Sequence, residues 1–418
     1  MYIKRAIEST ILKTERGFKA VLVTGPRQVG KSTVLRHLYE NRKYITFDDP
    51  VLLSETKNEP GLFFRNNKPP IILDEVQYIS ELFPYIKMEC DKTEEKGGFC
   101  LTGSQQYHLM RNVSETLAGR VGILELSGLS MREMSGCEFL KPFIPSQTYI
   151  EAREKEVHHC DNIWNIIHRG GYPALIDENV DWQTFYSSYV QTYIDRDINE
   201  LGNVKDKLKF TQFLTAMAAR TGQMLNYSNV AEQIEVAVST VKEWTSLLEA
   251  SGIIYVMQPY SNSALNRAIK TPKIYFRDTG LVCFLTKYQT AETAMNGAMA
   301  GELFETFAVS EILKSFSNAG MDYRMNVSYY RGKDKRRRIE DGKKTEREVE
   351  IDLLIEQDDV IYPIEIKMSA NPKLGMTNAF DILDKIHSKK RGIGVILCMY
   401  DTPLWLKENI VALPIEYI

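Results

Sequence analysis

The segment GPRQVGKS, Gly25 to Ser32, carries the clearest chemical signal in this sequence. It fits the spacing G-x-x-x-x-G-K-[ST] and lies between an apolar stretch, AVLVT, and a segment with helical periodicity. Gly25 and Gly30 let the backbone wrap an anion with its N–H groups inward, and the following helix points its positive end at the same anion. Lys31 is expected to reach the β- and γ-phosphates of ATP, and the Ser32 hydroxyl to bind Mg²⁺. The sequence thus predicts a nucleotide-binding loop made of Gly25, Pro26, Arg27, Gln28, Val29, Gly30, Lys31, Ser32 and Thr33.

Two acidic residues end a second apolar stretch, PPIILDEVQ, in which Ile71–Leu73 has the character of a buried strand. Ligands of open α/β sheets bind at the carboxyl ends of the strands, so Asp74 and Glu75 are expected near the phosphates. We predict that Asp74 holds Mg²⁺, directly or through water, and that Glu75 orients and deprotonates the attacking water. The alternative is that the two acids only end the strand.

Two further candidates follow in the chain. In FCLTGSQQ the polar residues Thr102, Ser104 and Gln105 end another apolar strand, and Ser104 is our candidate for sensing the γ-phosphate or positioning water. A strand-end turn satisfied by its own hydrogen bonds is the alternative. Arg120, in TLAGRVG, is a candidate for stabilising transition-state charge, within its own subunit or across a subunit interface, and a surface salt bridge is the alternative.

A second possible centre lies near the other end of the sequence. Asp352 falls in the strand-like segment EVEIDLLIE, and Glu365 and Lys367 fall in the next, IYPIEIK. Residues two apart on a strand point to the same face, and a hairpin would bring Asp352 beside Glu365. Two such carboxylates can hold Mg²⁺, which lowers the pKa of a bound water. Lys367 would orient that water as the nucleophile, and Glu305 on the preceding helix would be the third acidic residue of the site. This order of residues resembles the PD-(D/E)xK fold of Holliday-junction resolvases and restriction enzymes. The alternative is that Glu365 and Lys367 only form the solvated face of an amphipathic strand.

Two basic segments make DNA a candidate partner, and a mobile solvated loop is the alternative for the first of them. Gly332–Arg347 holds eight basic and four acidic residues, and Asn266–Asp278 contains Arg267, Lys270, Lys273 and Arg277 against one acid. The helix expected at Val238–Ala250 is less favourable, because its outer face mixes Lys242 with Glu243 and Glu249, and Trp244 is expected in its core.

The elements that must position these residues predict an α/β protein. Strands expected at 20–24, 44–47, 71–73, 99–102 and 122–126 alternate with helices, which is typical of a parallel sheet covered on both faces. Residues 206–258 show three helices and the start of a hairpin, the pattern of a winged helix, and residues from about 301 onward form a small α/β unit. We expect domains at 1–130, 131–205 (a helical linker), 206–298 and 299–418.

Composition excludes several classes of protein. The 418 residues carry 52 Lys and Arg against 55 Asp and Glu, a net charge of −3, which excludes a globally basic nucleic-acid binder. Six scattered cysteines form no C-x-x-C pair, and no apolar run approaches the roughly 18 residues of a membrane span. We expect a cytoplasmic protein with reduced thiols and no membrane contact.

The motifs together resemble a large prokaryotic family of AAA-like P-loop ATPases. The resemblance rests on GPRQVGKS, ILDEVQ, LTGSQ, LAGRV and RGGYP, and on the later segments YIDRDI, TPKIYFRDTGL, EIDLLI and PIEIK. It implies a P-loop NTPase sheet, then a helical and winged-helix region, then a small α/β domain like that of restriction endonucleases. Two hypotheses remain open: an ATP-driven enzyme that acts on DNA, and an ATP-dependent switch that binds protein partners and carries an inert C-terminal domain.

Overall fold

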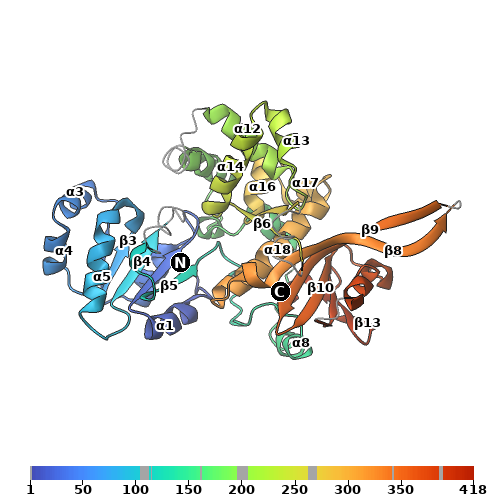
Figure 1. Ribbon diagram of the computed structural model, residues 1–418, viewed down its shortest axis with the longest axis horizontal. Coiled ribbons are helices and arrows are strands. Elements are labelled where there is room, and N and C mark those ends of the chain that lie inside the picture. The colour runs from blue at the N-terminus through green and yellow to red at the C-terminus, as the bar shows by residue number, and fades with distance from the viewer. Residues whose placement is uncertain are drawn as a thin grey trace.

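The computed structural model describes residues 2–103, 113, 115–160, 162–194, 206–261, 271–340, 343–385 and 389–418, without the side chains of 333–347 and 385. Three lobes follow each other along the chain (Figure 1): a blue N-terminal lobe, a mainly green helical lobe and an orange-to-red C-terminal lobe. The predicted residue Ser104 lies outside the described residues.

The N-terminal lobe is built on a parallel sheet, as predicted. Its strands are β1 (Ala20–Thr24), β2 (Lys43–Thr46), β3 (Ile71–Asp74), β4 (Phe99–Gly103) and β5 (Val121–Glu125). Their order is β2-β3-β4-β1-β5, so that β4 separates the strand before the glycine-rich loop from the strand that ends in Asp74. All carboxyl ends therefore meet at one edge of the sheet.

Helices and loops cover both faces of this sheet, which explains why its strands consist of consecutive apolar residues. Val21 and Val23 of β1 join one apolar core, whereas Ala20 and Leu22 point into the other. The covering helices are α1 (Glu8–Gly17), α2 (Lys31–Leu38), α3 (Pro50–Asn58), α4 (Pro60–Asn66) and α5 (Phe83–Asp91). Helix α1 begins at Glu8, and the segment before it packs near the glycine-rich loop, where Arg5 donates to the carbonyl oxygen of Val29.

The middle region is mostly helical. Its longer elements are α8 (Gln147–Glu154), α9 (Ile163–Arg169), α10 (Trp182–Thr192), α12 (Lys207–Ala218), α13 (Tyr227–Ile234), α14 (Val238–Ala250) and α16 (Thr279–Leu285), with the shorter α7 (Met131–Met134) and α17 (Ala291–Met295). Strands β6 (Ile254–Met257) and β7 (Lys273–Phe276) pair antiparallel after α14. Three helices are thus followed by an antiparallel pair of strands, and the assignment of this region to a winged helix stays a prediction. Trp244 lies in the core against Phe210 and Phe213, as predicted.

The C-terminal lobe joins one long helix to a mixed sheet. The helix is α18 (Ala300–Asn318), and the sheet has the order β13-β14-β12-β10-β9-β8 with β11 beside β10. Its strands are β8 (Val327–Glu340), β9 (Lys343–Gln357), β10 (Val360–Ile366), β11 (Lys390–Arg391), β12 (Gly394–Cys398), β13 (Leu404–Lys407) and β14 (Ile410–Pro414). The hairpin β8–β9 projects from the body of the molecule (Figure 1).

The short helix α19 (Tyr323–Asn326) precedes this sheet. It starts where the Asp322 side chain accepts a hydrogen bond from the backbone N–H of Arg324, so that β8 begins only at Val327. Helix α18 contacts β5, β7, β10 and several helices, so even Glu311 and Lys314 are buried on it and pair with each other. Among the described residues, no helix is both long enough and apolar enough to cross a membrane.

Candidate nucleotide site and C-terminal acidic cluster

The glycine-rich loop leaves the carboxyl end of β1 and leads into α2, as the motif requires. Gly25 has a φ of 142°, and a Cβ atom there would lie 2.0 Å from the carbonyl oxygen of Leu126. Gly30 has a φ of 92° and directly precedes α2. A side chain at Gly25 would clash with the backbone of Leu126, and the positive φ of Gly30 favours glycine, so both residues are needed for the shape of the loop.

The Lys31 side chain folds back over this loop. Its Nζ donates to the carbonyl oxygens of Gly25 at 3.1 Å and Pro26 at 2.9 Å, and the residue is buried. A positive charge therefore lies inside the loop, where an anionic phosphate would meet it.

Asp74 stands at the centre of a group of hydroxyls. Ser32 Oγ donates to Asp74 Oδ1 at 2.7 Å, the Thr102 hydroxyl donates to the same oxygen, and the Tyr44 hydroxyl donates to Oδ2 at 2.5 Å. Burial and the neighbouring Asp74 raise the pKa of Tyr44, so this phenol keeps its proton. A hydroxyl and a carboxylate that converge are the oxygen donors that Mg²⁺ takes, so Ser32 and Asp74 fit the predicted cation.

Glu75 lies beside this group in a left-handed backbone conformation, with a φ of 56°. Its backbone N–H donates to Thr102 Oγ1 at 3.2 Å, and the Gln77 side chain donates to its carboxylate. The Thr102 hydroxyl therefore bonds to both acidic residues. The sequence indicated that a polar residue at the end of β4 takes part in the site, and Ser104 was our candidate. Thr102 becomes the neighbour of Asp74 because β4 lies between β1 and β3, which the sequence does not show.

Arg120 does not face the loop of its own chain, so the prediction that it acts within its subunit was wrong. It directly precedes β5, whose first residue pairs with Ala20 at the start of β1, whereas the loop follows the other end of β1. Its guanidinium donates to both carboxylate oxygens of Asp91, at 2.6 and 3.0 Å. Action on a neighbouring subunit stays a prediction.

A different arginine, Arg5, supports the loop and was missed. It is buried, and its guanidinium donates to the carbonyl oxygens of Val29 at 2.7 Å and Ser127 at 2.8 Å and pairs with Glu133 at 2.9 Å. The sequence shows Arg5 only as one of several charges in an amphipathic segment, so no local signal separates it from a surface residue.

The C-terminal acidic cluster forms where β9 and β10 pair. Leu353 pairs with Ile364, and continuing this antiparallel register by one residue places Asp352 opposite Glu365. Lys367 Nζ lies 3.2 Å from Asp352 Oδ2 and 2.7 Å from Glu365 Oε1. The two carboxylate oxygens therefore lie within about 6 Å of each other, as strand alternation predicts.

Glu305, on α18, approaches this cluster but is held by β7. Its Oε1 accepts a hydrogen bond from the Tyr275 hydroxyl at 2.6 Å and lies 3.3 Å from Lys273 Nζ. Burial, and then the charge of Asp352, raise the pKa of Glu305; the same two causes raise the pKa of Glu365.

The acidic cluster, meaning Glu305, Asp352 and Glu365, fits a divalent cation in part. Glu365 Oε2 is buried without a hydrogen-bond partner, which is expected of an oxygen that awaits a proton or a cation. In the described part of the chain, however, no group of three or more His, Cys, Asp or Glu residues is arranged to hold a metal ion. Asp352 and Glu365 share Lys367, whereas one oxygen of Glu305 is bonded to residues of β7.

The second basic segment is not a DNA-facing surface at its described residues. Lys273 and Arg277 are buried in ion pairs with Glu350 and Glu125, respectively, so they offer no charge to a phosphate backbone. The first basic segment falls on the hairpin β8–β9, but most of its side chains lie outside the described residues.

Family models cover most of the chain. Residues 17–135 match the model of an AAA domain, residues 160–292 match a domain of unknown function (DUF8612), and residues 300–418 match another (DUF4143). The N-terminal lobe contains the first of these matches and is named the AAA domain after it.

Similar proteins are known from two mycobacteria and from solved structures. The uncharacterized proteins Rv2008c of Mycobacterium tuberculosis and Mb2031c of Mycobacterium bovis are each 26% identical to this chain over 367 residues, 87% of this chain and 74% of the relative. The Walker-type ATPase PABY2304 of Pyrococcus abyssi has 15% identity and a TM-score of 0.42, with 68% of this chain and 96% of that chain covered. The RuvB Holliday junction branch migration motor of Thermotoga maritima has 17% identity and a TM-score of 0.28, with 60% and 86% covered.

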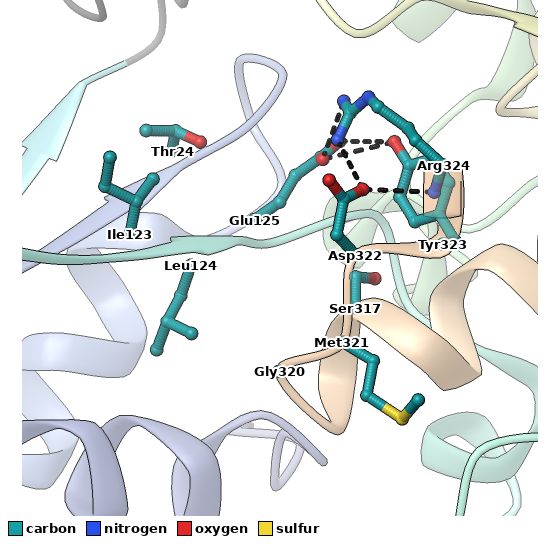
Figure 2. A pocket seen from close by; sticks show the side chains of 10 residues that line it. All are labelled: Thr24, Ile123, Leu124, Glu125, Ser317, Gly320, Met321, Asp322, Tyr323 and Arg324. Atoms are coloured by element: carbon teal, nitrogen blue, oxygen red, sulfur yellow. Dashed lines mark hydrogen bonds and ion pairs between the residues drawn. The ribbon is translucent and has the colours of Figure 1, made fainter. Parts of the chain in front are cut away.

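The AAA domain meets the rest of the chain around Glu125, the last residue of β5. Figure 2 shows its carboxylate directed at Tyr323 and Arg324, beside a cavity of about 370 Å³. Tyr323 donates to it at 3.1 Å, Arg324 lies at 3.3 Å, and the buried Arg277 of the middle region pairs with it as well. Burial alone would raise the pKa of Glu125, but the two guanidinium groups outweigh burial and hold it below its usual range. One carboxylate thus joins all three lobes.

Proposed function

We propose that this protein is a Mg²⁺-dependent ATPase. The observation that carries the proposal is the contact of Ser32, on the P-loop, with the Asp74 carboxylate at the end of β3. The loop, with Lys31 inside it, binds the phosphates of ATP. Ser32 and Asp74 hold Mg²⁺, which neutralises phosphate charge when it is bound.

Glu75 is the candidate base of this reaction. It follows Asp74 at the carboxyl edge of the sheet, where the water that attacks the γ-phosphate must lie. Thr102 fixes the backbone of Glu75 and the carboxylate of Asp74 with one hydroxyl, so that both acids keep their places. Ser104 is retained as a candidate γ-phosphate sensor, and Arg120 as a group that reaches the ATP of a neighbouring copy in an oligomer.

A phosphate-release assay across a Mg²⁺ titration tests the ATPase. We expect hydrolysis by the purified chain that stops when EDTA removes the cation, and Asp74→Asn should raise the Mg²⁺ concentration needed for half-maximal rate. Asp48→Asn, a change of an exposed residue near the end of β2, is the matched control. If the wild type releases no phosphate, or if both variants behave alike, the proposal is wrong.

We further propose that the protein acts on DNA through its C-terminal lobe. The support is the acidic cluster with Lys367, in which Asp352 and Glu365 converge on two paired strands and lie near Glu305. In a nuclease of the PD-(D/E)xK type, such carboxylates bind Mg²⁺ and the lysine orients the nucleophile. The three helices and hairpin of residues 206–276 are the proposed winged helix, and the hairpin β8–β9 carries the most basic sequence of the chain.

The test is incubation with Mg²⁺, ATP and branched, linear or single-stranded DNA, with binding and cleavage scored together. Wild type should cut at least one of these substrates, and Asp352→Ala should bind it without cutting. Asp401→Ala, at an exposed acid of the same lobe, should cut like wild type.

The second candidate is an ATP-dependent switch that binds a protein partner. It is favoured by the burial of Asp352 and Glu365 and by the mixed charges on the outer face of α14. DNA that is neither bound nor cut under any nucleotide condition would decide for this switch.

A further inference from the structure

Strand β7 reaches the acidic cluster from the middle region. Lys273 and Tyr275 lie two residues apart and so share one face of the strand. Lys273 Nζ lies 2.6 Å from Glu350 Oε1 and 3.3 Å from Glu305 Oε1, and the Tyr275 hydroxyl donates to that same Glu305 oxygen at 2.6 Å. Both side chains are buried, so these contacts are part of the packed interface.

The other end of β7 is tied to the AAA domain. Arg277 directly follows the strand; its guanidinium pairs with Glu125 and donates to Ser127 Oγ at 2.7 Å. Four residue steps of a strand separate Lys273 from Arg277, a span of about 13 Å. One short segment therefore touches both the edge of the nucleotide-binding sheet and the acidic cluster.

The link continues to the P-loop through the sheet. Glu125 is the register partner of Thr24, the residue that directly precedes Gly25. The loop also contacts the middle region, since a Cβ atom at Gly252 would lie 3.0 Å from Pro26 Cγ. A change in the loop on nucleotide binding thus has a packed route to β7, and a packed interface transmits small shifts rather than absorbing them.

Two contacts of β7 engage one oxygen of the acidic cluster. Asp352 and Glu365 share Lys367, but Glu305 Oε1 is already satisfied by Tyr275 and Lys273. Glu305 Oε1 is therefore engaged on β7, although the acid lies close enough to Asp352 for that charge to raise its pKa, and Glu365 Oε2 has no partner.

We propose that Lys273 and Tyr275 are positioning residues that keep Glu305 Oε1 bonded to β7, so that this oxygen does not join a cation held by Asp352 and Glu365, and that the AAA domain controls this hold through Arg277. The inference rests on the proposed function of the acidic cluster as a divalent-cation centre. Movement of β7 frees Glu305 and completes the cluster, so that the nucleotide state sets the affinity for the cation.

Mn²⁺ binding to the full chain, measured by electron paramagnetic resonance without nucleotide, tests the hold. The site of interest is the binding that Asp352→Ala abolishes. Tyr275→Phe removes one hydrogen bond to a carboxylate and no charge, and it should tighten this site roughly tenfold. Tyr2→Phe, which removes the hydroxyl that donates to Glu8 in the N-terminal segment, is the matched control and should change nothing.

Two further variants separate positioning from simple electrostatics. Lys273→Met should also tighten the site, and adding Glu305→Gln to either variant should return the affinity to that of wild type. If the increased Mn²⁺ affinity persists in the presence of Glu305→Gln, the increase comes from the change in charge alone, and the positioning role of Lys273 and Tyr275 is refuted. Equal affinity in wild type and Tyr275→Phe would refute it too, while leaving the cation centre intact.

Hydrogen exchange tests the control by nucleotide. Mg·ATP added to Glu75→Gln should change the exchange of amides 273–277, and Mg·ATP added to Lys31→Ala should not. Unchanged exchange in the first protein would overturn the link from the P-loop to β7. If no Mn²⁺ binding depends on Asp352 in any variant, the cation centre itself fails, and the positioning role falls with it.

Discussion

Replacement of Thr102 by valine tests the nucleotide site most directly. Thr102 is fully buried at the end of β4; its hydroxyl donates to Asp74 and accepts from the backbone N–H of Glu75. Valine keeps the branched shape that suits a strand but removes both hydrogen bonds. The proposed cation ligand and the proposed base would lose their common support at once.

The size of the effect follows from the type of hydrogen bond. A hydrogen bond to a charged group contributes about 1.5–3 kcal/mol, and each 1.36 kcal/mol lost from the transition state is about a tenfold loss of rate. Thr102→Val should therefore lower kcat by roughly ten- to 150-fold. Affinity for ATP should change little, because the proposed phosphate ligands are Lys31 and the loop backbone rather than Thr102.

The assay is steady-state phosphate release, with ATP affinity measured separately by calorimetry. Thr102→Ser keeps the hydroxyl and should retain most of the rate, which separates the hydrogen bonds from packing. If Thr102→Val turns over ATP like wild type, or if Thr102→Ser is equally impaired, the two hydrogen bonds do not orient the acids and the reasoning is wrong.

Four other predictions concern the AAA domain. Lys31→Ala should remove most of the affinity for Mg·ATP, because it deletes the charge inside the loop; unchanged binding in calorimetry would contradict this. Glu75→Gln should bind ATP normally, yet phosphate release should fall by roughly two orders of magnitude. Arg120→Ala should leave ATP affinity unchanged, and any loss of turnover should appear only at concentrations where the chain self-associates. The pKa of the Glu125 carboxylate is held below its ordinary value by Arg277. The stability that this ion pair contributes is therefore present above the ordinary carboxyl pKa and is lost as pH falls through the depressed pKa. Glu125→Gln should lower the free energy of unfolding by about 3–5 kcal/mol at pH 7, measured by urea unfolding, and a loss of stability that does not shrink in acid would contradict this assignment.

The nucleotide site was largely predictable because its signals are local. The spacing of Gly25, Gly30, Lys31 and Ser32 encodes a loop between a strand and a helix, and parallel strands bring their carboxyl ends to one edge. Asp74 was therefore expected at the same sheet edge as Ser32, and the fold brings them into contact by leaving only β4 between their strands. The pairing of Asp352 with Glu365 is local in the same sense, because two consecutive strands and a period of two fix which side chains meet.

Tertiary structure decided the rest, since strand order and burial depend on contacts between residues far apart in the chain. Only the place of β4 between β1 and β3 makes Thr102 the neighbour of Asp74, and only the direction of β5 puts Arg120 at the far edge from the loop. Lys273 and Arg277 look like a basic surface in the sequence, yet packing buries each against a carboxylate of another lobe. A charge in a sequence does not show whether it faces water or an opposite charge, because its partner is supplied by the fold.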